Sequence, residues 1–548
     1  MSVILTSAAV AFAGGSIFAQ SAAATQGTPP TDATARQIED MARRLESLEK
    51  RNAELQGQVV ELNAKAGDQW LTEERAAEVR EIVQDVLADT ATRTSLQGSG
   101  ATAGWDNGFF LASADNRFRI EFGGLIQARW MLSAQKAQYV SPPQIDGGAS
   151  IQWDPVPTRY GFDLQNIELW AQGHVVSPDI QYMVKGIFSQ NQDVGTQVGQ
   201  AQSPIQLNTP LASFMTGSTS GGLQLLDAWV RVNLTDDWSF RMGQFRAPYG
   251  REFLVLEQYQ MAVDRSLVSL HYGMGYTQGV ELEWITNEAR WRFAIDDGGT
   301  DNIVGPARVV GSQPLNSPWY AQNAQWGITT RFDWKGEGGW KQFDQFTSPE
   351  GTEPGWLWGI AFNAQQTDPT KVISLTQGPG ATSAYSKNTW LGVTTDLTMQ
   401  FGGASLFASA YFNHVESNGA YFLTTVNQQN YAEAGDVNAL GFVLQASYYL
   451  APKWEVYGRY EYMHTTASNS GDPAIQNLPI SNYLFQQHHM DLLTIGANWY
   501  IDGQDVKFTA DMGWSLTPVY PSYAVPATGW RVSQADEFVL RAQMQLLF

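Results

Sequence analysis

The stretch FRIEFGGLIQARW, residues 118–130, decides the fold because apolar and polar side chains alternate along it with a period of two. Phe118, Phe122, Ile126 and Trp130 fall on one face, whereas arginine, glutamate and glutamine fall on the other. Such alternation is typical of a β-strand, but strands in soluble sheets usually run about five or six residues. A strand of this length can cross a bilayer at a tilt. We therefore predict a transmembrane strand with an apolar lipid side and a polar lumen side.

The same alternation recurs down to the C-terminus. Sixteen candidate strands begin near residues 118, 162, 180, 224, 238, 278, 289, 323, 356, 387, 403, 437, 453, 490, 504 and 535. Short turns alternate with long connections, except that 335–355 is long where a short turn is expected. An even strand number with loops sorted by end is the pattern of outer-membrane barrels. We predict an all-β transmembrane barrel of about 16 antiparallel strands over residues 109–548, preceded by an α-helical coiled coil.

The composition excludes several classes of protein. The chain of 548 residues is 12% aromatic and only 16% charged, which excludes a disordered protein. Beyond residue 24, no apolar run approaches the roughly 18 residues that a membrane helix needs. A net charge of −21 disfavours binding to nucleic acid. The absence of cysteine excludes thiolate zinc sites and thiol catalysis.

Signals of catalysis and of metal binding are also poor. The sequence contains no nucleophile-elbow, zinc-protease or phosphate-loop signature. His488 and His489 are adjacent, and adjacent residues of a strand point to opposite faces, so they make a poor chelate. We expect neither an enzyme, nor a metal site, nor a cofactor.

The N-terminal region predicts export followed by helices. Residues 1–24 have the length and small residues of a signal peptide, although the missing basic start leaves open a true start upstream. The alternative is a disordered Ala-rich tail. Residues 25–36 and 91–108 are predicted linkers, 37–66 a coiled coil and 67–90 an amphipathic helix.

The predicted coil rests on an unbroken heptad seam with spacings of three and four. The seam residues are Ile38, Met41, Leu45, Leu48, Asn52, Leu55, Val59 and Leu62. A polar residue on the a row, here Asn52, fixes the register of a coiled coil at some cost in stability. We predict oligomerisation through this seam; the alternative is a helix that packs on its own domain.

The C-terminal strand carries an apolar face that ends on the last residue. Phe548, Leu546 and Met544 share that face, with arginine and glutamine between them. A terminal Phe on an alternating strand resembles the recognition signal of the barrel assembly machinery. We predict that these residues are an assembly signal and that this machinery is a partner.

Four segments carry a resemblance to a known family. LDAWV at 226–230, MGQFRAPYG at 242–250, DRSL at 264–267 and GVEL at 279–282 resemble the core of the phosphate-selective porin O and P family. The resemblance covers roughly 109–548 and implies a sixteen-stranded, trimeric outer-membrane channel. The N-terminal region resembles extended members of the family from planctomycete-like bacteria.

The chain departs from the family at one informative place. Where members usually carry an Arg-Arg pair at the start of the second strand, this sequence has Gln165 and Asn166. Lysines, which line the vestibules of the phosphate channels, are few and scattered here. The family name therefore does not give the solute.

Charged residues on the predicted lumen faces are the candidate site. A pore selects by its width and by charge at its narrowest point. The candidates on strands are Arg119, Arg129, Arg241, Glu281, Glu283, Arg290 and Arg292, and those in or beside the third long loop, 247–277, are Arg246, Arg251, Glu252, Glu257, Asp264 and Arg265. Opposed rows of charge would give a transverse field; alternatively, most charges pair across neighbouring strands. We expect the apolar loop to fold into the lumen and narrow it, or else to pack between subunits.

These observations predict a water-filled outer-membrane porin for passive diffusion of small hydrophilic solutes or ions, weakly selective or mildly cation-preferring. One alternative is an anion- or phosphate-selective porin. Another is an envelope-tethering protein that acts through a periplasmic coil, with peptidoglycan as a partner. We expect the outer membrane of a Gram-negative-type bacterium, with the coil in the periplasm, and as partners membrane lipid and two further copies in a homotrimer, but no nucleic acid.

Overall fold

The computed structural model describes residues 101–548 with gaps. The gaps are 106–107, 135–137, 140–152, 155–157, 189–223, 300–315, 317, 322–323, 368–372, 375–382, 385–387, 418–419, 426–427, 434–435, 468–487, 520–522 and 532–536. The predicted signal peptide, first linker, coiled coil and amphipathic helix, residues 1–90, lie outside the described residues. No helix among the described residues is long and apolar enough to span a membrane.

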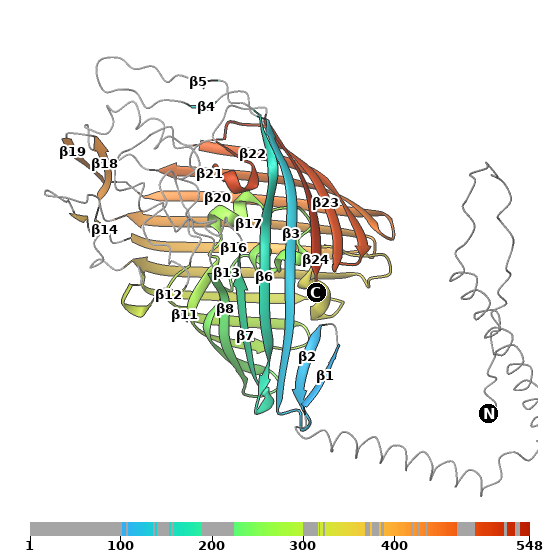
Figure 1. Cartoon of the computed structure of the whole chain (residues 1–548). Coiled ribbons are helices and arrows are strands. Elements are labelled where there is room, and N and C mark those ends of the chain that lie inside the picture. The colour runs from blue at the N-terminus through green and yellow to red at the C-terminus, as the bar shows by residue number, and fades with distance from the viewer. Residues whose placement is uncertain are drawn as a thin grey trace, which may run out of the picture. The chain divides into compact units, whose positions relative to one another are not determined.

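Sixteen antiparallel strands form a closed barrel, as the sequence predicts (Figure 1). They are β3(Phe118–Ala134), β6(Arg159–Val175), β7(Ser177–Ile187), β8(Gln224–Asn233), β9(Trp238–Arg246), β10(Tyr276–Ile285), β11(Ala289–Asp296), β12(Ala324–Lys335), β13(Gly355–Thr367), β16(Asn388–Gln400), β17(Ala404–Ser417), β20(Val437–Ala451), β21(Trp454–Ala467), β22(His488–Asp502), β23(Val506–Ser515) and β24(Glu537–Leu547). Each pairs with the next, and β24 pairs with β3. Every strand begins within three residues of its predicted start.

Smaller elements lie at the ends of the barrel strands and inside the barrel. The short strands are β1(Ala101–Trp105), β2(Phe109–Ser113), β4(Gln138–Tyr139), β5(Trp153–Asp154), β14(Ile373–Ser374), β15(Ser383–Ala384), β18(Ala420–Thr425) and β19(Gln428–Glu433). The helical turns are α4(Arg251–Leu254), η2(Glu257–Tyr259), α5(Leu267–Tyr272), η3(Trp319–Ala321), η4(Trp340–Asp344) and η5(Pro526–Thr528). Strand β1 falls inside the segment 91–108 that the sequence predicts as a linker, because its small residues pair with the more apolar β2.

The period-two pattern fixes which side chains face outward. On β3, Phe118, Phe122 and Ile126 are exposed on the outer face, whereas Gln127 and Arg129 are buried on the lumen side. The register carries this alternation from strand to strand, since directly paired residues share a face. The predicted facing of the strands is therefore confirmed in the structure.

The connections are sorted by length between the two ends of the barrel. Single residues or short turns join β6 to β7, β8 to β9, β10 to β11, β16 to β17, β20 to β21 and β22 to β23, and this end is called the short-turn end. Strand β3 starts and β24 finishes at this end, because both are antiparallel to the neighbours whose turns lie there. The connection 336–354 is the long exception that the sequence indicates.

The C-terminal residue seals the barrel against a glycine. The amide of Gly124 donates to the carbonyl of Phe548 at 2.7 Å, and the amide of Phe548 donates back at 3.0 Å. A Cβ added to Gly124 would lie 2.5 Å from the Phe548 ring. A side chain at position 124 would therefore displace the Phe548 ring.

Candidate functional site

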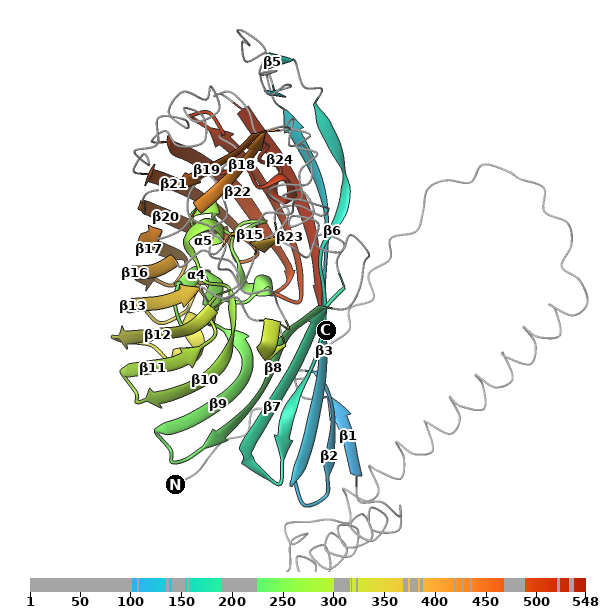
Figure 2. The same ribbon diagram turned by 90° about the vertical axis from the view of Figure 1, so that its left-hand side faces the viewer.

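The connection 247–275 between β9 and β10 lies inside the barrel. Figure 2 shows α4 and α5 within the arc of the strands. Its apolar residues, including Val255, Met261 and Val268, pack in one buried cluster with side chains from the far wall such as Tyr411 and Met463. This packing explains why the sequence of the connection is so apolar. The predicted folding of the loop into the lumen is what the structure shows.

Asp264 fixes the middle of this loop to the seam where the barrel closes. Its carboxylate accepts from Arg129 of β3 at 2.8 Å and from Arg541 of β24 at 2.9 Å. Gln165 donates to the same carboxylate at 2.9 Å, and Arg129 also pairs with Asp163 at 2.7 Å. One of the two residues at the usual Arg-Arg position thus holds the loop through an amide.

Glu257 of η2 gathers three cations on the other side of the loop. Arg246 lies 2.5 Å, Arg265 2.9 Å and Lys185 3.6 Å from its carboxylate. Burial alone would raise the pKa of Glu257, but the charges of these cations hold it well below the ordinary value. Lys185 also pairs with the buried Glu168 at 2.5 Å. The loop is therefore ionically fixed to β7 as well.

The first turn of α5 is held by acidic side chains. Glu252 accepts from the amide of Ser266 at 2.7 Å, and Ser266 caps α5 by accepting from the Ser269 amide at 3.0 Å. The amide of Leu267 donates to Glu461 of β21 at 2.6 Å. Three backbone amides at the helix start, those of Ser266, Leu267 and Ser269, are thus satisfied by the loop itself and by the far wall.

A second segment enters the lumen from the short-turn end. In the connection 336–354, Phe343 and Phe346 are buried, and Arg251 of α4 donates to the Phe343 carbonyl. Burial lowers the pKa of Arg251 to about 10, so its guanidinium stays charged at neutral pH. Thr347 donates to Glu455 of β21 at 2.8 Å. The two inserted segments therefore meet inside the barrel.

Three arginines converge on one aspartate beside this contact. Asp333 of β12 accepts from Arg290 and Arg292 at 3.1 Å each and pairs with Arg331 at 2.7 Å. Arg331 also forms a two-pronged contact with Asp396, at 2.8 and 2.9 Å. The Nε atoms of Arg292 and of the nearby Arg251 are buried without a hydrogen-bond partner. Arginines thus outnumber carboxylates in this cluster.

The wall formed by β8, β9 and β10 carries paired charges and a tryptophan. Arg231 pairs with Glu283 at 3.0 Å, and Arg241 pairs with Glu281 at 2.7 Å. The guanidinium carbons of both arginines lie over the ring of Trp229, at 5.7 and 5.5 Å. Such stacking holds the arginines against the wall.

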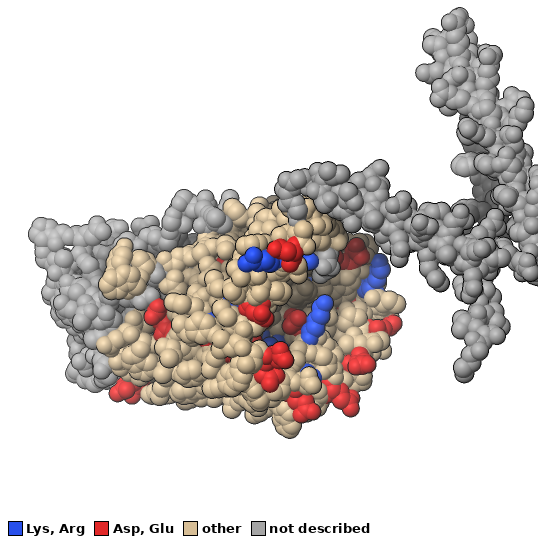
Figure 3. Space-filling view, turned by 90° about the horizontal axis from the view of Figure 1, so that it is seen from below, with Lys and Arg blue, Asp and Glu red and all other residues tan. Residues whose placement is uncertain are grey.

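Among the described lumen residues, partly exposed charged side chains lie on one side of the barrel. On β3 and β6–β11, the side chains of Arg119, Glu121, Asp163, Arg231 and Arg290 are between 20% and 31% exposed. On β21–β24, Glu455, Thr494, Asn498, Thr509 and Gln543 are at most 3% exposed beneath the inserted loop. Figure 3 shows basic and acidic side chains around a recess in the view from below. The partly exposed lumen side chains therefore lie on the β3–β11 side, where Arg129, Glu168 and Glu281 are nevertheless buried.

The structure places every predicted strand candidate on the lumen side and pairs most of them locally. Arg119 pairs with Glu121 of its own strand at 2.7 Å, and the other strand arginines pair with acids named above. Among the loop arginines, Arg246 and Arg265 converge on Glu257, whereas Arg251 lies apart. These charged residues therefore pair locally and do not form opposed rows of charge.

Sequence reasoning missed the lumenal role of 336–354 and of Lys185 and Lys507. Lys507 is buried and donates to the carbonyls of Gln258 and Gln260 at 3.0 Å each. Two features of 336–354 could have indicated this role: its length, where a two-residue turn would be enough to join the strands, and its three aromatic residues. The lysines gave no signal beyond their lumen-facing positions.

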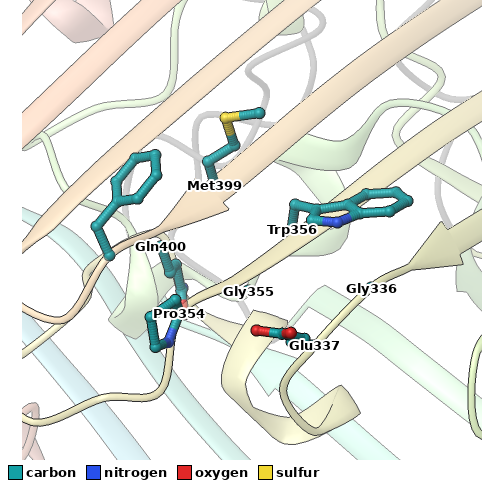
Figure 4. A pocket seen from close by; sticks show the side chains of 8 residues that line it. Gly336, Glu337, Pro354, Gly355, Trp356, Met399 and Gln400 are labelled. Carbon is teal, nitrogen blue, oxygen red and sulfur yellow. The ribbon is translucent and has the colours of Figure 1, made fainter.

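The described pocket of about 360 Å³ lies outside the lumen. It is lined by Pro354, Trp356, Met399, Phe401 and Glu337, and Figure 4 shows Trp356 and Met399 on neighbouring strands. Trp356 and Met399 pair directly and share the outer face with the exposed Phe401. Among the described residues, no three acidic or histidine side chains converge in a way that could hold a metal ion.

The chain is similar to one protein family and, at low identity, to several solved structures. A family model described as phosphate-selective porin O and P matches residues 155–302 and 362–548. No curated protein matches the chain. Among solved structures, a loop-deletion mutant of the Vibrio cholerae outer-membrane protein OmpT is 9% identical, with a TM-score of 0.44 over 78% of this chain and 99% of its own. An anion-selective porin from Comamonas acidovorans is 11% identical, with a TM-score of 0.44 over 78% and 99%. The channel DcaP of Acinetobacter baumannii is 10% identical, with a TM-score of 0.42 over 78% and 97%.

Proposed function

Since this chain belongs to the phosphate-selective porin O and P family and forms an outer-membrane channel barrel, we propose that it passes small hydrophilic solutes by passive diffusion with weak selectivity. The solutes move past the partly exposed side chains of β3–β11, beside the points at which Arg129 and Lys185 hold loop 247–275. Loop 247–275 sets the width of the channel, and the β3–β11 wall carries charges of both signs.

The one-sided exposure of the lumen carries this proposal. Charged side chains such as Arg231 and Glu121 keep water contact on one wall, while Glu455 and Asn498 on the other wall keep none. A barrel filled throughout by its insertions would bury both walls alike. A barrel without insertions would expose both.

Weak selectivity follows from the local pairing of the wall charges. Arg231 with Glu283 and Arg241 with Glu281 present nearly neutral pairs, which attract neither ion strongly. The net charge of −21 favours cations at the mouths, although salt screens it beyond about 8 Å. This part of the proposal is a mildly cation-preferring pore without a saturable phosphate site.

The cluster around Asp333 favours a second candidate, an anion-preferring pore. The ion pairs of Arg290, Arg292 and Arg331 are with Asp333 and Asp396, and Arg251 lies beside them. Asp344, Glu281 and Glu283 also act on these arginines and offset their charge only in part, because Glu281 and Glu283 pair with Arg241 and Arg231. Arg290 is partly exposed, so a passing anion can reach the cluster.

The two candidates separate in planar bilayers. The reversal potential in a salt gradient gives the sign of the preference, and millimolar phosphate added in chloride reports a binding site. A saturable block by phosphate that disappears in Arg290→Gln, but persists in Arg119→Gln, establishes the anion candidate. A cation-sign potential without block establishes the first. Absence of any conductance contradicts both.

The N-terminal region adds a proposal on assembly and localisation. The heptad seam from Ile38 to Leu62 supports a homotrimer joined by a parallel coil. We place the coil on the periplasmic side because β3 starts at the short-turn end, and short turns face the periplasm in outer-membrane barrels. In the alternative proposal, an envelope-tethering protein, the coil binds peptidoglycan. Deleting residues 25–99 should leave conductance intact; loss of envelope integrity with unchanged conductance would favour the tether.

A further inference from the structure

The pocket at the short-turn end of β13 and β16 has two glycines in its lining. Gly336 opens the connection 336–354, which turns into the lumen, and Gly355 follows it. A Cβ on Gly336 would lie 2.2 Å from Nε1 of Trp356, and one on Gly355 would lie 2.5 Å from the carbonyl oxygen of Glu337. Side chains at these two positions would therefore displace the walls of the space of about 360 Å³.

The apolar wall of the pocket belongs to the lipid-facing surface of the barrel. Trp356 and Met399 pair directly on the outer face, and Figure 4 shows both beside the opening. Trp334 of β12 packs edge-on against Trp356, with 5.1 Å between the ring centroids. Further along β13 the same face continues with the exposed Ile360 and Phe362. An acyl chain that lies against β13 can therefore enter the pocket without leaving apolar surroundings.

The pocket lies where lipid headgroups meet lipid tails on the periplasmic side. Short turns face the periplasm in outer-membrane barrels, and aromatic residues form a girdle at each membrane–water interface. The pocket adjoins the first residue of β13, Gly355, and the last residue of β16, Gln400. Trp334, Trp356 and Phe401 lie at this same end of their strands. Its occupant therefore comes from the periplasmic leaflet, whose lipids are phospholipids.

Glu337 and Gln400 offer hydrogen-bond acceptors at the pocket. Glu337 is exposed and is the one charged residue among the eight that line it. Gln400 donates through Nε2 to the carbonyls of Gln342, Gln345 and Thr347, at 3.2, 3.1 and 3.2 Å. These bonds fix the amide, and its Oε1 is buried without a hydrogen-bond partner. A carboxylate and an amide oxygen together suit a cationic group that carries several N–H donors.

We propose that this pocket binds a phospholipid whose headgroup carries a primary ammonium, such as phosphatidylethanolamine. One acyl chain lies along Trp356 and Met399, and the ammonium group donates to Glu337 and to Oε1 of Gln400. A choline headgroup has the positive charge but no N–H to donate. A glycerol headgroup leaves the lipid with a net negative charge, which Glu337 repels. Because Glu337 belongs to the connection 336–354, the bound lipid holds the base of this lumenal segment at the membrane surface.

Photolabelling of the full-length protein in vesicles tests the site. The probes are phosphatidylethanolamine, phosphatidylcholine and phosphatidylglycerol with the same diazirine-bearing acyl chain, and mass spectrometry identifies the labelled peptides. Glu337→Gln removes the carboxylate at nearly constant size. Glu350→Gln, which changes an exposed acid of the same connection that does not line the pocket, is the matched control. Heat-shift electrophoresis verifies that each variant folds as a barrel.

We expect phosphatidylethanolamine to label the peptides with Trp356 and Met399 about fivefold more than the other two lipids, the factor that corresponds to about 1 kcal/mol for an exposed charge pair. Glu337→Gln should abolish this preference, and Glu350→Gln should retain it. Equal labelling by the three lipids in the parent protein would identify ordinary boundary lipid and overturn the proposal. A preference that survives in Glu337→Gln, or that is lost equally in Glu350→Gln, would overturn it as well. None of these outcomes depends on conductance, so they separate this proposal from the proposed function.

Discussion

At the scale of single residues, buried carboxylates decide where the lumen insertion lies. Asp264 neutralises Arg129 and Arg541 at the seam of the barrel, and Glu257 does the same for Arg246 and Arg265. A buried charge that loses its partner is far more costly than a surface pair is useful. These carboxylates are therefore the residues whose loss should release the loop.

We expect Asp264→Ala to free the loop from the seam and to raise single-channel conductance. Removing one partner of a buried pair typically costs about 3–5 kcal/mol, which the loop can relieve by moving away from Arg129 and Arg541. Single-channel recording and limited proteolysis of the loop measure the effect. Glu121→Ala, which removes a partly exposed carboxylate from the same lumen, is the control. Unchanged conductance and protease resistance in Asp264→Ala would refute the anchoring role.

Gly124 is the residue on which the terminal Phe548 closes the barrel. We expect Gly124→Leu to lower the yield of heat-shifted barrel about as much as deletion of Phe548, because the new side chain meets the ring. Gly161→Leu is the matched control, since a Cβ at that lumen-facing glycine meets nothing within 4 Å. Equal yields of the two leucine variants in outer-membrane fractions would show that barrel formation does not require the Phe548 ring to pack on Gly124.

At the scale of elements, the period of the sequence predicted the strands but not the insertions. Alternation gave sixteen strands and the facing of Arg129, Arg241 and Glu281, because paired strands repeat one geometry at every step. The path of 336–354 could not be read in this way. Contacts such as Thr347 with Glu455 join segments about a hundred positions apart, and local pattern carries no information on them.

The connection 336–354 supports loop 247–275 from the short-turn end. An Asn-Gly turn can replace residues 337–355, because Gly336 and Trp356 are already hydrogen-bonded to each other and a two-residue turn joins such a pair. We expect higher conductance and a less stable loop, since Arg251 loses its carbonyl partner on Phe343. Lys341→Ala, an exposed position of the same segment, should leave both unchanged. If the shortened protein conducts like the parent, the segment supports nothing in the lumen.

At the scale of the whole molecule, the barrel is divided into an open side and a filled side. Loop 247–275 packs its apolar side chains on the wall from β13 to β24, including β20, and is held to β3 and β7 by ion pairs. Charged side chains of β3–β11 such as Glu121 and Arg231 keep partial contact with water. The sequence predicted a barrel with a loop inside it, but gave no indication of which wall the loop would cover. That choice depends on long-range pairs such as Lys507 with the Gln258 carbonyl.

Cysteine accessibility during conduction tests directly whether the lumen has an open side and a filled side. The chain has no cysteine, so single variants such as Arg231→Cys on the open wall and Thr494→Cys on the filled wall give unambiguous reporters. A membrane-impermeant thiosulfonate reagent is added while single-channel current is recorded. We expect a stepwise loss of current in Arg231→Cys and no change in Thr494→Cys. Block in Thr494→Cys, or current that ignores the reagent in Arg231→Cys, would contradict it.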